Sequence, residues 1–414
     1  MRDNTLVAAM QALGHDVTLL PMYTPMRLDE EDAGEKHIFY GGIEAYLLQR
    51  FPRASWWRNF LLRMAGTQAV LRLMPRFDIG GAVDPKANAE LTLSMLRGEN
   101  GNQASLLGEM VDWLAGELKP DLIHVTNTLV SGLVPALKRR LKVPIVCGLH
   151  GEDIFLEGLP EAYYPQALQL IRQNAAYIDH FIAISAYYAA YFAPQAGILP
   201  EQITLVRPGI DFRDYPHPDK ASLPDGVPTI GYLARISPEK GLHLLVEAFI
   251  LLARSGEFPG LRLRAAGYLS NAQAAYVAAI RKRAREAGLS GQVEIVGTVD
   301  RRQKLDFLAS LDVFSVPTIY RDPKGLPVLE ALAAGVPVVQ PNHGAFPELL
   351  RATGGGLLHE PENPADLANC LAVLLRDPQQ RHDMGRRGRQ IVFEHFSAVR
   401  MAQDTAAVYQ KVLS

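Results

Sequence analysis

The stretch YRDPKGLPVLEALAAGVPVV, residues 320–339, carries the strongest indication of the fold in this sequence. Pro327 suits the first turn of a helix, and Gly335 suits the residue that ends one. The apolar run that follows is typical of a buried strand. The stretch therefore predicts a loop, a short helix and a parallel strand, with Asp322 in the loop and Glu330 about one turn into the helix.

The alternation of β-rich apolar runs and helical patterns continues on both sides of this stretch, which is typical of parallel α/β units. In the first half we expect strands over 16–20, 121–126, 143–150, 180–185 and 203–211. Helices are expected there over 5–14 and 106–118. In the second half we expect strands over 229–236, 261–267, 293–297, 313–318 and 336–341. Helices are expected there over 239–256, 271–288, 301–310 and 326–335, and again from 363 onward.

The length of 414 residues favours two domains over a single core. A segment rich in Pro, Asp and Lys predicts a linker over 216–228, between an N-terminal domain over 1–215 and a C-terminal domain over 229–390. The N-terminal domain includes an insertion at about 28–90. We expect an α/β protein with two doubly wound sheets and a cleft between them, where the carboxyl ends of the strands hold a ligand.

The chain opens on a helical pattern, RDNTLVAAMQALG at 2–14, whereas a doubly wound domain normally begins with a strand in the middle of its sheet. Either that first strand is missing from this chain, or the sheet is built without it. A central strand supplies hydrogen bonds on both of its sides. We therefore expect the natural product to begin upstream of Met1, with a strand and a Gly-rich turn.

Composition narrows the class of protein. A net charge of -2 gives no reason to expect a nucleic-acid partner. Cys147 and Cys370 offer neither a disulfide framework nor a metal-binding spacing, and the sequence contains no Asp-x-Asp triplet, Walker loop or His-Glu-x-x-His motif. It shows no signal-peptide pattern and no apolar run long enough to span a bilayer. We expect a cytoplasmic protein that requires no metal or other cofactor.

The stretch ARISPEKG, residues 234–241, places Arg235 and Lys240 on either side of an expected helix start. Ser237 is suited to cap that helix, and Pro238 suits its first turn. Two cations and free N–H groups at the end of a strand suit a diphosphate. Taken alone, the stretch is about equally consistent with a capped helix flanked by two solvated bases.

The two acids of the opening stretch, Asp322 and Glu330, could each accept hydrogen bonds from paired hydroxyls of a ribose or hexose. N–H groups near Gly325 and Leu326 could hold an anion at the helix N-terminus. Alternatively, Glu330 is only an acid that favours the helix dipole. His150 lies at the carboxyl end of an expected strand, where a lone histidine is more often structural than catalytic.

Six arginines occur between residues 50 and 76 with no acid among them, beside Trp56, Trp57 and Phe60. Such a stretch could lie on an anionic membrane surface or bind an anionic acceptor. We favour an insertion that packs on the N-terminal domain with its arginines solvated, and we keep a peripheral membrane contact as the alternative.

Together, ARISPEKG and DPKGLPVLEALAAGVPVV resemble the C-terminal domain of the family 4 glycosyltransferases, the glycosyl transferases group 1. Members of that family are retaining enzymes of the GT-B fold that use nucleotide-sugar donors without a metal. GHDVTLL, LHGED, FIAIS and RPGID fit the N-terminal half of the family in order. PNHGAFPELL and GGGLLHEPENPADLA fit the rest of the second domain, so the resemblance covers nearly the whole chain.

The resemblance implies a donor-binding role for each candidate residue. Two cations would bind the diphosphate, one carboxylate the ribose, and a second carboxylate the sugar hydroxyls. Two backbone amides would contact the phosphate and sugar, a histidine would lie near the transferred sugar, and a glycine would lie near the base. Arg235 and Lys240 are the two cations, Glu330 is the carboxylate at the ribose, and Asp322 is the carboxylate at the sugar hydroxyls. Gly325 and Leu326 supply the two backbone amides, His150 is the histidine near the transferred sugar, and Gly297 is the glycine near the base. The final segment, 391–414, would cross back onto the N-terminal domain.

The sequence departs from the family pattern at three places. The first acid of the family is usually Glu where this chain has Asp322, and the family's linker motif often has Asn where this chain has Pro208. The family also begins with a strand and a Gly-rich loop, which we do not find at the start of this chain.

The expected function is metal-independent, retaining transfer of a sugar from a nucleotide-diphosphate sugar to a hydroxyl acceptor, which could be a glycan, a lipid-linked molecule or a small molecule. One alternative is a non-catalytic protein of the same fold that binds sugar nucleotides or glycans. The other is a sugar-nucleotide epimerase.

Overall fold

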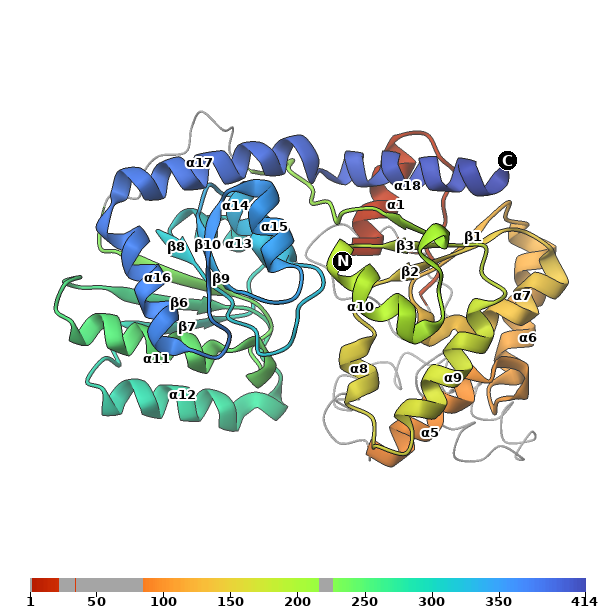
Figure 1. Cartoon of the computed structure of the whole chain (residues 1–414), viewed down its shortest axis with the longest axis horizontal. Coiled ribbons are helices and arrows are strands. Elements are labelled where there is room, and N and C mark those ends of the chain that lie inside the picture. Colours follow the sequence, from red (N-terminus) through yellow and green to blue (C-terminus); the bar gives the residue numbers. More distant parts are fainter. Residues whose placement is uncertain (1, 22–33, 35–84, 216–225) are drawn as a thin grey trace, which may run out of the picture.

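A computed structural model describes the following residues of the chain: 2–21, 34, 85–215 and 226–414. They form two α/β domains that lie side by side (Figure 1). The Arg/Trp stretch at 50–76, most of the expected insertion at 28–90 and most of the expected linker at 216–228 lie outside the described residues.

The N-terminal domain is built on a parallel sheet with the strand order β1-β2-β3-β4. All four lie within stretches expected to be strands: Ile123–Val125 (β1), Ile145–Leu149 (β2), His180–Ala183 (β3) and Ile203–Leu205 (β4). The strand expected at 16–20 is not formed, and Leu19 makes only an isolated parallel bridge to Gly34. Thr18 is exposed and Val17 is half-buried, so this stretch lacks the full burial of a central strand.

Different helices cover the two faces of this sheet. In β2, Ile145, Cys147 and Leu149 face one hydrophobic cluster, whereas Val146 faces another, as the alternation of side chains along a strand requires. The first cluster is completed by Pro85–Leu96 (α5), Ala104–Trp113 (α6), Val134–Leu141 (α7), Asp153–Glu157 (α8), Tyr164–Ala175 (α9) and Ala186–Ala196 (α10). The second is closed by Arg2–Ala12 (α1) and Ala398–Leu413 (α18), which pack against each other.

The C-terminal domain contains a six-stranded parallel sheet with the order β10-β9-β8-β5-β6-β7. Its strands are Thr229–Leu233 (β5), Arg262–Ala266 (β6), Val293–Gly297 (β7), Val313–Phe314 (β8), Val338–Pro341 (β9) and Gly356–His359 (β10). Only β10 was not expected as a strand, because it is short and three of its four residues are half-buried. The strand order reverses between β5 and β8, and ligands bind at such switch points in open α/β sheets.

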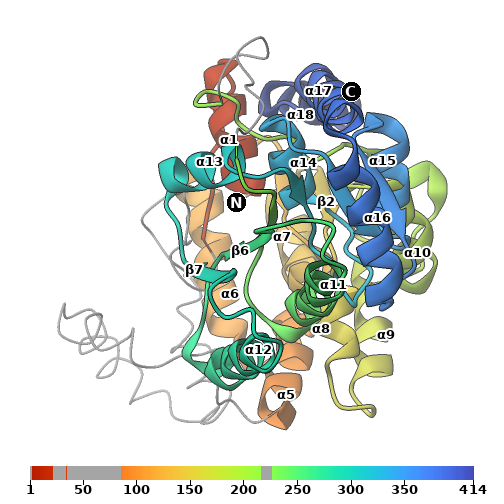
Figure 2. The same cartoon turned by 90° about the vertical axis from the view of Figure 1, so that its left-hand side faces the viewer.

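The helices of this domain form a layer on each side of the sheet (Figure 2). In α11 the expected apolar face is confirmed, because Leu242, Leu245, Val246 and Phe249 are all buried. This helix contacts both α12 and α16, whereas α17 packs across α14 and α15. The bounds are Leu242–Arg254 (α11), Ala274–Glu286 (α12), Arg301–Ala309 (α13), Leu326–Ala333 (α14), Phe346–Thr353 (α15), Pro364–Arg376 (α16) and Pro378–His395 (α17).

The end of the chain changes domain between α17 and α18 (Figure 1). Val392 and Phe396 belong to the core of the C-terminal domain, and Met401 belongs to the cluster under α1. The change therefore falls near Ser397, a few residues after the boundary expected at 390. There Ile210 N–H donates to the carbonyl of Phe396, and Ala398 N–H donates to the carbonyl of Ile210, both at 2.9 Å.

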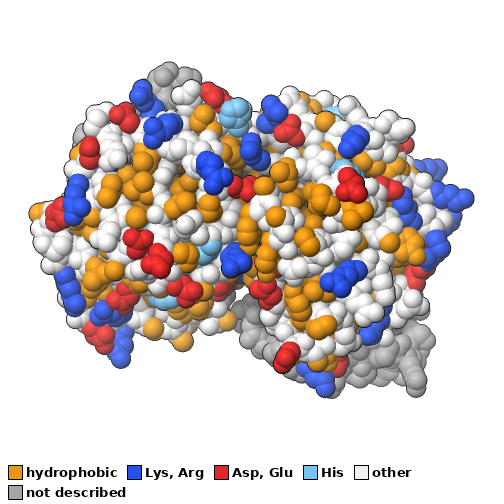
Figure 3. Space-filling view, viewed as in Figure 1, with side chains coloured by type: hydrophobic (Ala, Val, Ile, Leu, Met, Phe, Trp, Pro, Cys, Tyr) orange, Lys and Arg blue, Asp and Glu red, His pale blue; other side chains and the backbone are white. Residues whose placement is uncertain are grey.

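Charged side chains are spread over both domains on the face shown in Figure 3, with lysines and arginines interspersed with acids. Among the described residues, no helix is long and apolar enough to cross a membrane.

Candidate active site

A hydrogen-bonded cluster joins the two C-terminal motifs at the carboxyl end of the sheet. Lys240, seven residues after the last residue of β5, donates through Nζ to Oδ2 of Asp322 at 2.9 Å. The hydroxyl of Tyr320 donates to the same oxygen at 2.8 Å and also contacts Nζ of Lys240. Lys240 Nζ lies over the Tyr320 ring as well, 4.7 Å from its centroid. Tyr320 was not among the expected site residues, although the sequence shows this aromatic residue two positions before the expected acid.

The other oxygen of Asp322 organises the loop that leads into α14. Oδ1 accepts hydrogen bonds from the N–H groups of Lys324 (2.9 Å) and Gly325 (3.1 Å). Burial alone would raise the pKa of the Asp322 carboxyl, but Lys240 and these two amides hold it well below its usual range. Asp322 is therefore an ionised carboxylate in this structure, and its contacts are with the protein.

Gly325 occupies the position just before α14 with φ of 63°, a left-handed conformation that favours glycine. A Cβ added there would lie 2.8 Å from Leu349 Cδ2, so the position is also tightly packed. Leu326 is the first residue of α14, as expected. The N–H of Gly325 already donates to Asp322, so a ligand would share this group or displace the carboxylate.

Arg235 lies two residues after β5 and is 58% exposed at its side chain. Its guanidinium pairs with Glu239 at 2.5 Å within the same loop. The expected helix from 239 begins instead as a short 3-10 turn, Pro238–Lys240, followed by Gly241 with φ of 74°. A Cβ on Gly241 would lie 1.8 Å from the carbonyl oxygen of Pro317, which is why the chain needs glycine here. Ser237 precedes the turn but makes no capping hydrogen bond through its side chain.

Glu330 lies in the second turn of α14, buried and paired with Lys304 of α13. Nζ of Lys304 donates to Oε1 of Glu330 at 2.7 Å, and both side chains are 7% exposed. Lys304 was not among the residues expected at the site. It could have been found because it shares the buried face of α13 with Phe307 and Leu308, and a lysine among apolar residues at helical spacing indicates a buried acidic partner.

His150 is on the opposite domain, immediately after β2. Its ring lies against the backbone of Gly148, where an added Cβ would be 2.7 Å from Nε2. Burial lowers the pKa of the His150 imidazole well below its usual value, so the ring is neutral at pH 7. The backbone N–H of His150 donates to Oε2 of Glu152 at 2.8 Å. Glu152 thus fixes the turn that carries the histidine, as a buried structural acid.

Two contacts bring His150 and the Asp322 loop to facing sides of the domain boundary. Gly151 has φ of 100°, and a Cβ there would lie 2.7 Å from Cγ of Pro323 in the other domain. Glu348 of α15 accepts the N–H groups of Ala186 (3.1 Å) and Tyr187 (2.8 Å) at the start of α10. Glu348 was not among the residues expected at the site, because nothing in the local pattern shows that its partner is on another domain.

Gly297 ends β7, at the edge of the six-stranded sheet, with φ of 85°. Its carbonyl accepts the N–H of Gly267, which follows β6, at 2.8 Å. The ends of β5, β6 and β7 therefore meet at the edge that also carries Arg235. The structure joins Lys240, Asp322 and Gly325 directly by hydrogen bonds. Arg235, Glu330, His150 and Gly297 lie around them with partners of their own.

The described residues contain no group of three or more His, Cys, Asp or Glu side chains that could hold a metal ion. The two cations of this site, Arg235 and Lys240, follow the end of β5 in the chain.

Two parallel α/β domains facing each other across such a site have the arrangement of the GT-B fold, and comparison with known proteins gives the family. Residues 4–209 match the glycosyl transferase 4-like domain, and residues 216–391 match glycosyl transferases group 1. The chain belongs to this family of glycosyltransferases.

Curated relatives agree with this membership. The putative colanic acid biosynthesis glycosyltransferase WcaL of Escherichia coli K12 is 30% identical over 291 residues, which cover 68% of each chain. A glycogen synthase of Mycobacterium tuberculosis is 28% identical over 297 residues, which cover 70% of this chain and 69% of the relative.

Solved structures share the fold at low identity. Anabaena Alr3699/HepE in complex with UDP and glucose superimposes with a TM-score of 0.63 and 23% identity, covering 76% of this chain and 83% of that one. A glycosyltransferase from Rickettsia africae has a TM-score of 0.61 and 16% identity, covering 96% of this chain and 98% of that one.

Proposed function

We propose that this glycosyltransferase moves a sugar, with retention of configuration and without a metal, from a nucleotide-diphosphate sugar to a hydroxyl acceptor. The observation that carries the proposal is the cluster of Lys240, Asp322 and Tyr320 beside the start of α14. It combines a cation, an ionised acid and a helix N-terminus at the carboxyl end of a parallel sheet, an arrangement that suits a diphosphate and its sugar. A neighbour in fold, HepE, was solved in complex with UDP-glucose.

The cations would stabilise the leaving diphosphate. Lys240 is already held over the start of α14 by Asp322, whereas Arg235 would exchange its contact with Glu239 for a phosphate oxygen. Charge that develops on the diphosphate as the sugar leaves would be neutralised by groups that need little reorganisation. This supplies the electrostatic role that a metal ion fills in other transferases.

The remaining candidates would position the donor. Glu330, oriented by Lys304, would accept the ribose hydroxyls, and the chain around Gly297 would lie beside the base. His150 is neutral and would face the sugar from the N-terminal domain. No described side chain is placed as an obvious base, so a departing phosphate oxygen would take the acceptor proton while the acceptor attacks from the same face.

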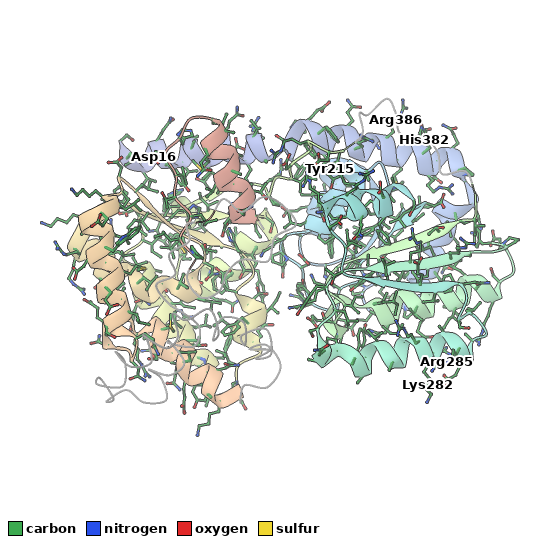
Figure 4. The ribbon with its side chains drawn as sticks, turned by 180° about the vertical axis from the view of Figure 1, so that it is seen from behind. Asp16, Tyr215, Lys282, Arg285, His382 and Arg386 are labelled. Atoms are coloured by element: carbon green, nitrogen blue, oxygen red, sulfur yellow. The ribbon has the colours of Figure 1, made fainter. Side chains whose placement is uncertain are left out.

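Binding of the bare nucleotide tests the donor site. UDP, GDP and ADP would be titrated calorimetrically into the wild-type protein and into Lys240→Ala. Removing one charge-assisted contact costs roughly 1.5–3 kcal/mol, so the preferred nucleotide should bind about tenfold more weakly or worse. Lys282→Ala is the matched control, because Lys282 lies on α12 at the outer side of the C-terminal domain (Figure 4). Unchanged affinity in Lys240→Ala would refute the assignment.

The chemistry has its own tests. Transfer from the preferred donor should persist in excess EDTA, and the anomeric configuration of the new bond, read by NMR coupling constants, should match the donor. Activity that EDTA abolishes and Mn²⁺ restores would contradict metal independence. Conversion of the donor with no acceptor present would point instead to an epimerase.

A further inference from the structure

Three nitrogen-bearing side chains at the domain boundary have unused donors. The guanidinium of Arg2, at the start of α1, is 6% exposed, yet its Nε and Nη2 have no hydrogen-bond partner among the described residues. His150 is 8% exposed, and its Nε2 likewise has no such partner. Lys324 is half-buried, and no hydrogen bond or ion pair joins its Nζ to another described residue. Buried nitrogens without partners cost free energy, so Arg2 and His150 leave the cluster incomplete as it stands.

These three side chains converge from both domains. Figure 1 shows the N-terminal end of α1 at the boundary between the domains. Gly151 follows His150 and lies against Pro323, and Pro323 precedes Lys324. Lys324 therefore lies beside the turn that carries His150. Burial lowers the pKa of His150, and Arg2 and Lys324 are both close enough to lower it further.

Of the acids nearby, Asp3 and Glu152 are already engaged, whereas Oδ1 of the buried Asp153 has no partner among the described residues. Asp3 binds Nη1 of Arg2 at 3.0 Å, which leaves the opposite edge of the guanidinium unused. Glu152 accepts the N–H of Thr128 through Oε1, and through Oε2 it accepts the N–H of His150 and the hydroxyl of Tyr188. Nδ1 of the neighbouring His124 lies 2.6 Å from the hydroxyl of Tyr409, and Nε2 of the same ring has no partner among the described residues.

The unused atoms have the geometry that an anion needs. Nε and Nη2 form one edge of the guanidinium, and two parallel N–H groups on that edge match the two oxygens of a carboxylate or phosphate. The Lys324 ammonium would add a second positive charge, and the His150 ring a further donor in the tautomer protonated at Nε2. Burial lowers the pKa of the Lys324 ammonium, whereas Asp322 of its own loop and Glu152 and Asp3 of the N-terminal domain oppose that shift.

We propose that Arg2, His150 and Lys324 form a second anion site, on the N-terminal side of the boundary, that binds a carboxylate or phosphate carried by a substrate. Two sources share this chemistry: a carboxylate on the transferred sugar, as in a uronic acid, and a phosphate on the acceptor. The proposal rests on the proposed function, because it specifies which donors or acceptors that transferase prefers. Diphosphate binding remains with Lys240 and Arg235.

Inorganic phosphate tests the site without any nucleotide. Phosphate should raise the melting temperature of the wild-type protein, and the variants Lys324→Gln and Arg2→Lys should lose most of that rise. Arg2→Lys keeps the positive charge but removes the two parallel N–H groups of the guanidinium edge. Lys324→Gln changes a half-buried residue, so at least this variant should fold normally. Arg321→Gln, on an exposed neighbour in the same loop, should respond as wild type does. A full rise in both variants would overturn the site.

Two matched pairs of probes then assign the source. In the donor arm, UDP-glucuronate is compared with UDP-glucose by calorimetry. In the acceptor arm, glucose 6-phosphate is compared with glucose in the presence of UDP. The anionic member of one pair should bind at least tenfold more tightly to the wild-type protein, and Lys324→Gln should remove most of that preference.

The arm that shows the preference identifies the source. Equal affinity within both pairs would overturn a substrate role for the site, even if inorganic phosphate binds there. Failure of the proposed donor site has a different signature, because nucleoside diphosphates would then not bind, and failure of transfer alone would show as nucleotide binding without a transferred sugar. The phosphate measurement would still decide whether the site exists.

Discussion

At the scale of single residues, the contacts of Asp322 explain what a side chain shorter than glutamate does at this position. It is one methylene shorter than the Glu usual in the family, and its carboxylate accepts four hydrogen bonds from Lys240, Tyr320, Lys324 and Gly325. A shorter arm keeps the carboxylate close to the loop backbone, where it can fix the start of α14. The residue therefore shapes the donor site through the loop, and any sugar hydroxyl it binds would compete with these protein contacts.

Replacing Asp322 should show this role in the pH dependence of stability. Asp322→Asn retains an acceptor for the amides but loses the charge opposite Lys240, which should cost roughly 1.5–3 kcal/mol at pH 7. The folded pKa is depressed, so the stabilisation is complete above the ordinary value of 3.8 and is lost as pH falls through the folded value. The wild-type advantage should therefore start to shrink below pH 3.8 in urea unfolding. A difference that stays constant down to pH 3 would argue against the ion pair.

The buried pair of Lys304 and Glu330 should behave as a unit. Removing one partner leaves the other buried and uncompensated, which costs about 3–5 kcal/mol, whereas removing both is far less damaging. We expect Lys304→Met and Glu330→Gln each to destabilise the protein strongly, and the double variant to be more stable than their summed effects imply. Urea unfolding of the four proteins completes the cycle. Strict additivity would show that the two side chains act independently.

At the scale of elements, the sequence predicted most of the sheet strands but few of the contacts between domains. Buried strands such as β2 and β5 are continuous apolar runs, so composition alone identifies them. The stretch at 16–20 has a similar composition and forms only a bridge, because burial depends on neighbours that the local pattern does not contain. For the same reason the sequence shows Lys240, Tyr320 and Lys304 as candidate residues, whereas it does not show that they meet Asp322 and Glu330 in the fold.

Helix α10 shows how one element links the domains. Ser185, which precedes α10 in the same domain, caps the helix by accepting the N–H of Tyr188 at 3.2 Å. Glu348 of the other domain accepts two further N–H groups at the same end. A carboxylate at a helix N-terminus contributes about 0.3–1 kcal/mol. Glu348→Ala should therefore shift the balance between closed and open domains by roughly two- to fivefold toward open. Single-molecule FRET between dyes on the two domains measures this balance.

The control for this experiment is Glu161→Ala, on an exposed acid of the N-terminal domain. It should leave the FRET distribution unchanged. If Glu348→Ala also leaves it unchanged, the cross-domain cap does not hold the domains together.

At the scale of the whole molecule, the two ends of the described chain meet on one face of the N-terminal sheet. Leu6 and Met10 of α1 and Met401 and Ala402 of α18 form one buried cluster with Val146 of β2. The chain therefore has to complete the C-terminal domain before α18 can cover the first one. The crossing is fixed by the pairing of Ile210 with Ser397, and a Cβ on Gly209 would lie 2.3 Å from the carbonyl oxygen of Ser397.

Shortening a buried side chain of α18 should therefore destabilise the N-terminal domain, against which this helix packs. Met401 is 1% exposed and accepts the N–H of Gly209 at Sδ (3.2 Å), so Met401→Ala should cost about 2–5 kcal/mol through lost burial and the cavity it leaves. Val399→Ala is the matched control on the same helix, because Val399 is 48% exposed and its truncation should change stability by no more than about 0.5 kcal/mol. Urea unfolding measures both, with limited proteolysis to report which domain opens first. In Met401→Ala the N-terminal domain should be cut at lower urea than the C-terminal domain. Equal midpoints for the two variants, or earlier cutting of the C-terminal domain, would mean that α18 rests on the N-terminal sheet without stabilising it.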